Sequence, residues 1–240
     1  MFVPPVAGAC AELSGESAAP ALADWCAGLR GAALTIDGLS CRFGGLVAVD
    51  DVGLQVEAGE HVALVGTNGS GKSTLLRAVL GLQGRSRGRI VLDGTDARSP
   101  GEWDARRRLA PWIPQRQATG RFPLTVDELL DSSGHRAAAV GVATRLGVAA
   151  LARQPLHTLS GGQLQRCFIA RAFGAMANGG RLLLADEPTA ALDFDGRDTV
   201  AGLLRALPAS VLVATHDRAV AARCDRVLEM ANGRVREVRM

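Results

Sequence analysis

The chain has 240 residues, of which 48% are hydrophobic and 21% charged. This length suits one domain with a sizeable core, and the composition excludes disordered and fibrous proteins. No apolar run approaches the roughly 18 residues of a membrane-spanning helix. The net charge of +3 is too small to indicate a nucleic-acid-binding surface. Five cysteines without a CxxC pair favour reduced thiols over a disulfide framework.

The N-terminal segment differs in composition from the rest of the chain. Residues 1–31 are rich in Ala, Ser, Gly and Pro, which predicts a flexible extension with at most a weak helix near 21–29. Pro4 and Pro5 interrupt its short apolar stretch, and it lacks a basic start, so we do not expect an export signal. The folded domain is expected to span 32–240.

Short β-branched runs, separated by Gly and acidic residues, begin at residue 33 and predict strands. Apolar residues at helical spacing follow the third run, and a mainly helical, Ala-rich stretch broken by prolines predicts an inserted helical subdomain over about 97–175. The remainder alternates between buried strands and helices. The predicted strands are 34–43, 47–60, 61–66, 88–94, 181–188 and 210–217, the helices begin at 72, 195 and 218, and Asn232-Gly233 predicts a hairpin within 226–238.

A glycine-rich segment between the strand 61–66 and the next helix matches GxxxxGKS. Its residues are Gly66, Thr67, Asn68, Gly69, Ser70, Gly71, Lys72 and Ser73. Glycines let the backbone approach a polyphosphate, whose oxygens meet N–H groups at a helix N-terminus. Lys72 is expected to reach the β and γ phosphates, and the Ser73 hydroxyl is a ligand for Mg²⁺. Of the 27 Lys and Arg residues, only Lys72 is lysine, a bias that GC-rich coding explains elsewhere.

Two adjacent carboxylates, Asp186 and Glu187, end the apolar strand 181–188. Asp186 is expected to position Mg²⁺ and Glu187 to act as general base toward water, although acidic residues at strand ends are often only solvated charges. His216 ends the next buried strand and is a candidate donor to a γ phosphate; alone, such a histidine would usually have no special role.

The pentapeptide LSGGQ occupies residues 159–163. With this segment, the phosphate loop, the strand that ends in Asp186, and His216, the chain resembles the ATP-binding cassette (ABC) family over residues 33–240. The resemblance implies a phosphate-loop α/β fold with a mixed sheet, an N-terminal antiparallel β subdomain and the inserted helical subdomain, and ATPase activity with MgATP. It adds Gln115 as a sensor of Mg²⁺ and the attacking water and Phe43 as an adenine-stacking aromatic, for which core packing is the alternative. Further nucleotide contacts implied are Thr74, Ser160, Gly161, Gly162, Gln163 and Asp193 of the ALD loop.

Partners also follow from this resemblance. Ser160 begins a helix and forms a second anion site, but the helical insertion separates it from the phosphate loop. In the family two cassettes pair head to tail, so that the LSGGQ segment of one covers the ATP held by the other. The resemblance therefore implies a second copy of the cassette, a separate transmembrane permease, an indirect link to an extracytoplasmic solute-binding protein, and a place on the cytoplasmic face of the membrane.

Several functions compete with a transporter ATPase subunit. Non-transport cassette proteins usually have two cassettes or coiled-coil insertions, and a nucleotide kinase would not explain LSGGQ. Residues 111–130 resemble cassettes of zinc and manganese importers, in which a Phe-Pro pair precedes a TVDELL-like run, here 122–130. This indicates import of a divalent metal; an iron–siderophore importer and a small-molecule exporter remain alternatives.

Overall fold

A computed structural model describes residues 28–115, 117 and 123–238. The N-terminal extension therefore lies almost wholly outside the described residues, as does Phe122 of the Phe-Pro pair. No helix among the described residues is long and apolar enough to cross a membrane. The expected strands and helices are present, with bounds that differ by a few residues from those predicted.

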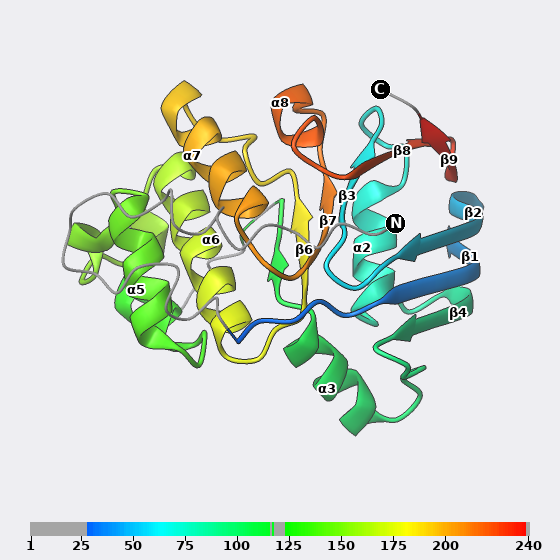
Figure 1. Ribbon diagram of the computed structural model, residues 1–240, viewed down its shortest axis with the longest axis horizontal. Helices are drawn as coiled ribbons and strands as arrows, with labels where there is room; N and C mark the ends of the chain where they lie inside the picture. The colour runs from blue at the N-terminus through cyan, green and yellow to red at the C-terminus, as the bar shows by residue number, and fades with distance from the viewer. Residues whose placement is uncertain (1–27, 116, 118–122, 239–240) are drawn as a thin grey trace.

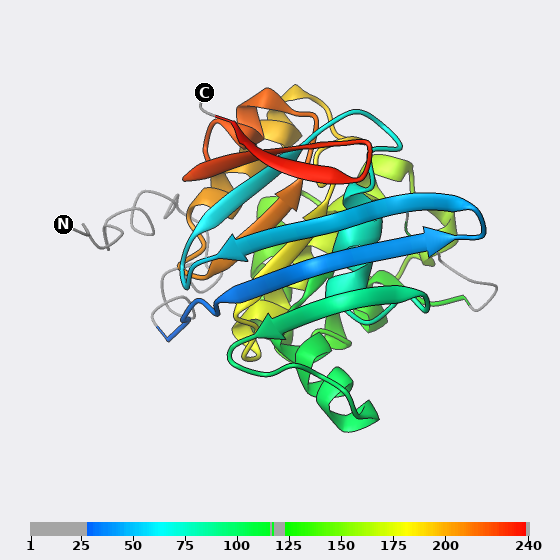
Figure 2. The ribbon, with the colours of Figure 1, turned by 90° about the vertical axis from the view of Figure 1, so that its right-hand side faces the viewer.

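Two sheets form the framework (Figures 1 and 2). The smaller is antiparallel with order β2-β1-β4, and the larger has order β5-β6-β7-β3-β8-β9. The strands of the smaller sheet are β1 (Leu34–Phe43), β2 (Leu46–Val56) and β4 (Ser86–Leu92). Those of the larger are β3 (His61–Val65), β5 (Trp112–Ile113), β6 (Leu182–Asp186), β7 (Ser210–Ala214), β8 (Arg226–Ala231) and β9 (Arg234–Val238).

The larger sheet is mixed, as expected. Its strands β5, β6, β7, β3 and β8 run parallel, and β9 pairs antiparallel with β8 through the predicted hairpin. Asn232 and Gly233 both have positive φ, 50° and 79°, the conformation that a two-residue hairpin turn requires. Because parallel strands end at one edge, Val65, Asp186 and Ala214 bring their following loops together there.

The strands of this sheet divide their side chains between two cores, because successive residues point to opposite faces. In β6, Leu182 and Leu184 pack toward the antiparallel sheet, whereas Leu183 and Ala185 pack toward the helices on the other side. This is why the run reads as continuously apolar. The helix α2 (Lys72–Val79) lies between the two sheets and buries Leu75, Leu76 and Val79 in the core between them.

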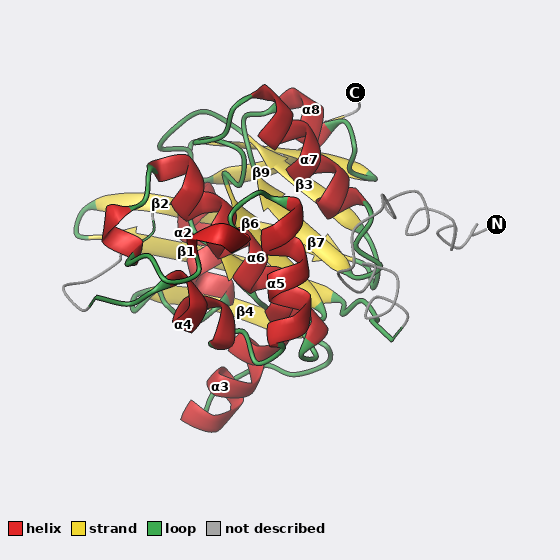
Figure 3. Ribbon diagram, turned by 90° about the vertical axis from the view of Figure 1, so that its left-hand side faces the viewer, coloured by secondary structure: helices red, strands yellow, loops and turns green. Residues whose placement is uncertain are grey.

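The remaining helices are α3 (Pro100–Leu109), α4 (Val126–Asp131), α5 (Arg136–Arg145), α6 (Gly161–Ala177), α7 (Phe194–Arg205) and α8 (Arg218–Ala221), with short 3₁₀ turns at Ala149–Leu151 and Leu156–Thr158. Of these, α4 to α8 cover the outer face of the larger sheet, whereas α3 projects away from them (Figure 3). Helices α4, α5 and α6 share the core on the outer side of the larger sheet, whereas Trp103 of α3 lies against Gly81, away from them. Strand β5 was not predicted, because two residues between Pro111 and Pro114 are too few to show a periodicity.

Candidate functional site

The phosphate loop joins the carboxyl end of β3 to the N-terminus of α2, as the sequence predicted. Gly66, Gly69 and Gly71 have positive φ. A Cβ on Gly66 would lie 2.2 Å from the Met230 carbonyl oxygen, and one on Gly71 would lie 2.2 Å from the Ala48 carbonyl oxygen. These two glycines are therefore required by backbone packing as well as by conformation. Their packing fixes a loop whose N–H groups surround the start of α2.

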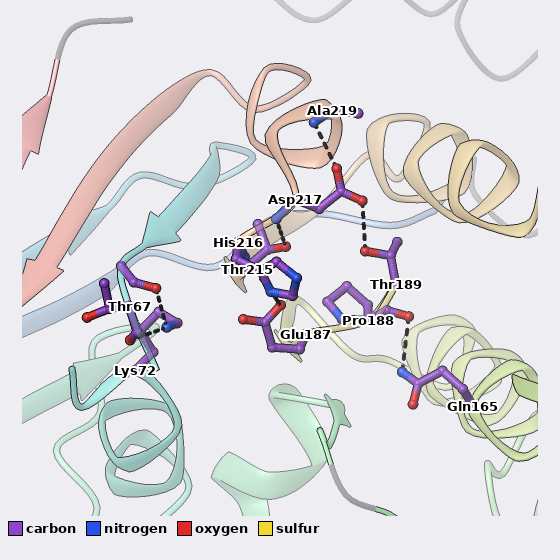
Figure 4. Close-up of polar contacts among 11 residues, drawn as sticks. Thr67, Lys72, Gln165, Glu187, Pro188, Thr189, Thr215, His216, Asp217 and Ala219 are labelled. Atoms are coloured by element: carbon purple, nitrogen blue, oxygen red, sulfur yellow. Dashed lines mark hydrogen bonds and ion pairs between the residues drawn. The ribbon is translucent and has the colours of Figure 1, made fainter. Parts of the chain in front are cut away.

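Lys72 is 6% exposed, and its ammonium is held inside this loop. Nζ donates to the carbonyl oxygens of Gly66 at 2.7 Å and Thr67 at 3.0 Å (Figure 4). The ammonium thus bonds to backbone carbonyls at the position where the sequence predicts phosphate oxygens.

A cavity of about 440 Å³ opens beside the loop. Most of the predicted nucleotide residues line it, and Leu46 and Ala48 join them without having been predicted. The lining residues are Phe43, Leu46, Ala48, Asn68, Gly69, Ser70, Gly71, Lys72, Ser73, Thr74, Gln115, Asp186 and Glu187. Phe43 is 47% exposed and absent from the hydrophobic cores, which opposes the alternative of core packing.

Asp186 is 1% exposed, and its two carboxylate oxygens make no hydrogen bond of ordinary geometry among the described residues, although the Ser73 hydroxyl lies near them. Burial raises its pKa above the ordinary value, and the nearby Glu187 raises it further, whereas the Ser73 hydroxyl and the charges of Arg77 and Lys72 oppose the change. A buried carboxylate in such surroundings binds a proton unless a cation compensates its charge. No group of three or more His, Cys, Asp or Glu side chains that could hold a metal occurs in the described part of the chain. Magnesium is compatible with this, because one or two protein oxygens and substrate phosphates usually bind it.

Glu187 is 4% exposed and has a left-handed backbone, φ 50°, which is uncommon for a residue with a Cβ. Its Oε2 accepts from the His216 backbone N–H at 3.3 Å and lies 2.8 Å from His216 Nδ1 (Figure 4). Oε1 has no partner among the residues described. His216 therefore contacts the carboxylate of Glu187, and its side chain is 67% exposed.

The LSGGQ segment lies outside the cavity. Ser160 is the N-cap of α6, where its hydroxyl accepts from the Gln163 N–H and the Gln163 side chain accepts from the Ser160 N–H. A Cβ on Gly161 would meet nothing within 4 Å, whereas one on Gly162 would lie 2.9 Å from the Ala191 carbonyl oxygen. None of these residues lines the cavity.

Asp193 is also apart from the cavity. It is the N-cap of α7, where it accepts from Gly196 N–H and pairs with Arg166 of α6 at 2.5 Å. The hydrogen bond from Arg166 holds the pKa of Asp193 below its ordinary value. The predicted residues thus form two groups, one around the phosphate loop and one at the start of α6 and α7.

The comparisons with known proteins agree with this geometry. The family model for the ABC transporter matches residues 49–190. The chain belongs to the ABC transporter family. It is 39% identical over 215 residues to the Fe(3+) ions import ATP-binding protein of Streptomyces coelicolor, covering 84% of this chain and 60% of that relative. It is 36% identical over 226 residues to the phosphonates import ATP-binding protein of Frankia casuarinae, covering 85% of this chain and 88% of that relative.

A solved structure with a similar fold is a dimeric bacterial ABC transporter cassette. The TM-score is 0.75 at 27% identity, covering 86% of this chain and 99% of that one. The cassette fold, with a mixed sheet and an antiparallel β subdomain, is thereby confirmed. These relatives do not support the zinc and manganese branch in particular, because the two named above are ATP-binding proteins for import of Fe(3+) ions and of phosphonates.

Sequence reasoning missed the buried Gln165, which connects α6 to loops beside Glu187. The only signal was an uncharged polar residue, two residues after Gln163, at the start of a helical run that is mainly apolar apart from Arg166 and Arg171.

Proposed function

We propose that this chain is the ATP-hydrolysing subunit of a membrane transporter, working with a permease on a separate chain and with a second copy of itself. The supporting observation is the buried carboxylate of Asp186 in the cavity that also contains Lys72 and Ser73. This donor set fits Mg²⁺ with a polyphosphate, since an anion-binding loop and an oxygen ligand face one cavity.

The chain's own residues divide the work by position. Lys72 exchanges its contacts with the Gly66 and Thr67 carbonyls for phosphate oxygens, while Phe43 offers an aromatic face at the cavity rim. Asp186, Ser73 and Gln115 would provide oxygen ligands for Mg²⁺, which when bound would neutralise phosphate charge. Each of these residues lines the same cavity.

Glu187 is the general base in this proposal. Its free Oε1 can accept a proton from a water aimed at the γ phosphate, while His216 and the backbone fix Oε2. His216 is exposed enough to leave the carboxylate and donate to the γ phosphate.

The second group of residues is proposed to act on the neighbouring copy. Gly161 has open space in front of it, and the start of α6 is a helix N-terminus without an internal anion. Ser160, Gly161, Gly162, Gln163 and Asp193 would therefore contact ATP held by the partner's phosphate loop. ATP would then join the two copies, and hydrolysis would let them separate.

For the cargo we propose a divalent metal ion, zinc or manganese, imported from an extracytoplasmic solute-binding protein. The support is the resemblance at 111–130, and the alternatives are an iron–siderophore importer, a small-molecule exporter and a non-transport ATPase. We propose residues 32–240 as the ATPase domain, with 97–175 as its helical subdomain next to the permease, and residues 1–31 as an extension without chemistry. The cassette would lie on the cytoplasmic face of the membrane through that permease, without nucleic acid.

The test is ATP hydrolysis by the purified chain with Mg²⁺, followed by copurification of a permease and reconstitution in vesicles. Expected results are Mg²⁺-dependent release of phosphate and stimulation by a solute-binding protein loaded with zinc or manganese. Stimulation by an iron–siderophore complex instead would select that alternative, and absence of hydrolysis would reject the ATPase proposal.

A further inference from the structure

Gln165 is a buried polar side chain that no role proposed so far uses. It lies near the start of α6, five residues after Ser160, and is 2% exposed. Its neighbours along the helix, Cys167 and Ile169, belong to the hydrophobic core. An amide in such surroundings is stable only when hydrogen-bonded, so its partners explain why it lies there.

The partners lie on two different loops. Gln165 Nε2 donates to the Pro188 carbonyl oxygen at 3.1 Å, and its Oε1 accepts from Gln117 Nε2. Gln117 also donates to the Pro114 carbonyl oxygen at 3.0 Å. One side chain therefore connects the LSGGQ helix to the loop after Glu187, the contact drawn in Figure 4, and also to the loop that contains Gln115.

The hydrogen bond to the Pro188 carbonyl lies next to Glu187, whose backbone is strained. Glu187 has φ 50°, a conformation that costs energy unless its neighbours hold it. The Glu187 N–H donates to the Ala214 carbonyl oxygen at 2.8 Å. Gln165 binds the carbonyl oxygen of the next residue, Pro188. On the other side, Thr189 Oγ1 donates to Asp217 Oδ2 at 3.0 Å. The segment 187–189 is thus held from α6 and from the turn after β7.

We propose that Gln165 is a positioning residue for the ATPase reaction: it holds the backbone after Glu187, so that the carboxylate faces the cavity, and ties this geometry to the orientation of α6. This inference rests on the proposed ATPase function. It predicts that a change at Gln165 alters the chemical step while leaving the phosphate loop unchanged, because neither of its loops contacts Lys72 through a described hydrogen bond.

The experiment compares steady-state ATP hydrolysis by the full chain and by Gln165→Met, which keeps the side-chain length and removes both amide contacts. We expect kcat to fall about tenfold or more and KM for ATP to change less than about threefold. A second variant, Gln165→Glu, is compared with the matched control Gln154→Glu, since Gln154 is exposed and its side chain has no hydrogen bond among the described residues. Gln165→Glu should lower kcat as Gln165→Met does, and Gln154→Glu should not.

A second measurement separates positioning from general destabilisation. If Gln165 acts through Glu187, then adding Gln165→Met to Glu187→Gln should lower the residual rate less than about threefold, because the group it positions is already lost. Unchanged kcat in Gln165→Met, a loss seen only in KM, or a full tenfold loss in the Glu187→Gln background would each overturn the proposal.

Should Gln165→Met fail to fold, Gln165→Glu decides by the same criteria, since it keeps the side-chain length and the Oε1 acceptor and removes only the donor to the Pro188 carbonyl oxygen. A fall in kcat without a change in KM supports the proposal, and wild-type kcat overturns it. The unchanged protein provides the separate test of the proposed function: if it does not hydrolyse ATP, the ATPase assignment fails before Gln165 is compared.

Discussion

Two glycine-containing helix N-termini in this chain differ in how complete they are. The phosphate loop is enclosed: Gly66 and Gly71 are in contact with backbone carbonyls, Lys72 is buried, and a cavity lies in front of it. The start of α6 is open, with its capping box satisfied internally and empty space at Gly161. The same local motif thus forms an enclosed site in one place and an open helix N-terminus in the other, which in the function proposed above a second copy of the chain completes.

The largest expected effect concerns the residue between the two sites. Glu187→Gln removes the general base and leaves both helix N-termini intact, so turnover should fall about 10²- to 10⁴-fold. In the presence of MgATP the variant should then accumulate as a dimer, which light scattering after size-exclusion chromatography measures. Near wild-type phosphate release, or a monomer at saturating MgATP, would contradict the comparison.

Lys72→Ala changes only the enclosed site. A charge-assisted hydrogen bond contributes about 1.5–3 kcal/mol, so ATP affinity should fall about 10- to 150-fold. Titration calorimetry of the monomer measures this directly. Arg77→Ala is the control, because this arginine is on the same helix and outside the cavity lining; equal losses in both variants would contradict the specific role of Lys72.

Gly161→Leu changes only the open site. The side chain enters empty space in the single chain, so melting temperature and monomer affinity for ATP should not fall. Crowding of the partner should cost about 1–3 kcal/mol, which weakens ATP-dependent dimerisation about 5- to 150-fold in the Glu187→Gln background. Gly101→Leu is the matched control, since Gly101 lies at the start of α3 with nothing within 4 Å. Full dimerisation of Gly161→Leu would show that the open site is not an interface.

The smallest effect concerns stability without ligand. Burial raises the pKa of Asp186, so the folded state binds this proton more tightly than the unfolded chain. The associated stability is present below the ordinary pKa and is lost as pH rises through the raised value. Asp186→Asn should therefore melt at a higher temperature than wild type at neutral pH, by about 2–4 °C per kcal/mol regained, with the difference shrinking toward pH 4.

MgATP should reverse this order, because it stabilises the wild type through bound metal and stabilises Asp186→Asn less. Scanning calorimetry at several pH values, with and without MgATP, gives both comparisons. A variant that melts lower than wild type without ligand would show that the carboxylate stabilises the empty fold.

Sequence patterns predicted the parts of the molecule that depend on local chemistry. The strand ending in Asp186 reads as buried because both of its faces are covered, and Asn232-Gly233 reads as a turn because both residues accept positive φ. The position of the phosphate loop between a strand and a helix was predicted for the same reason, because its conformation depends on consecutive residues. The resemblance to the ABC family then indicated Phe43 and Gln115, which do line the cavity.

What depends on tertiary contacts was not predictable in this way. Helix α6 is apolar on much of its surface, so the sequence does not tell which of Gln163 and Gln165 turns inward. Gln163 caps the helix while Gln165 is buried, a difference decided by loops about 25 residues after and 50 residues before it. The left-handed backbone of Glu187 and the two-residue strand β5 likewise depend on neighbours distant in the chain.

The hydrogen bonds of Lys72 have a consequence for nucleotide exchange. Because Nζ donates to the Gly66 and Thr67 carbonyls, the buried ammonium has acceptors within the loop itself. In the function proposed above, a nucleotide that enters would offer Nζ phosphate oxygens in place of these two carbonyls, and its departure would return them. Exchange of nucleotide would then need only new acceptors for one side chain, without melting and refolding of the first turn of α2.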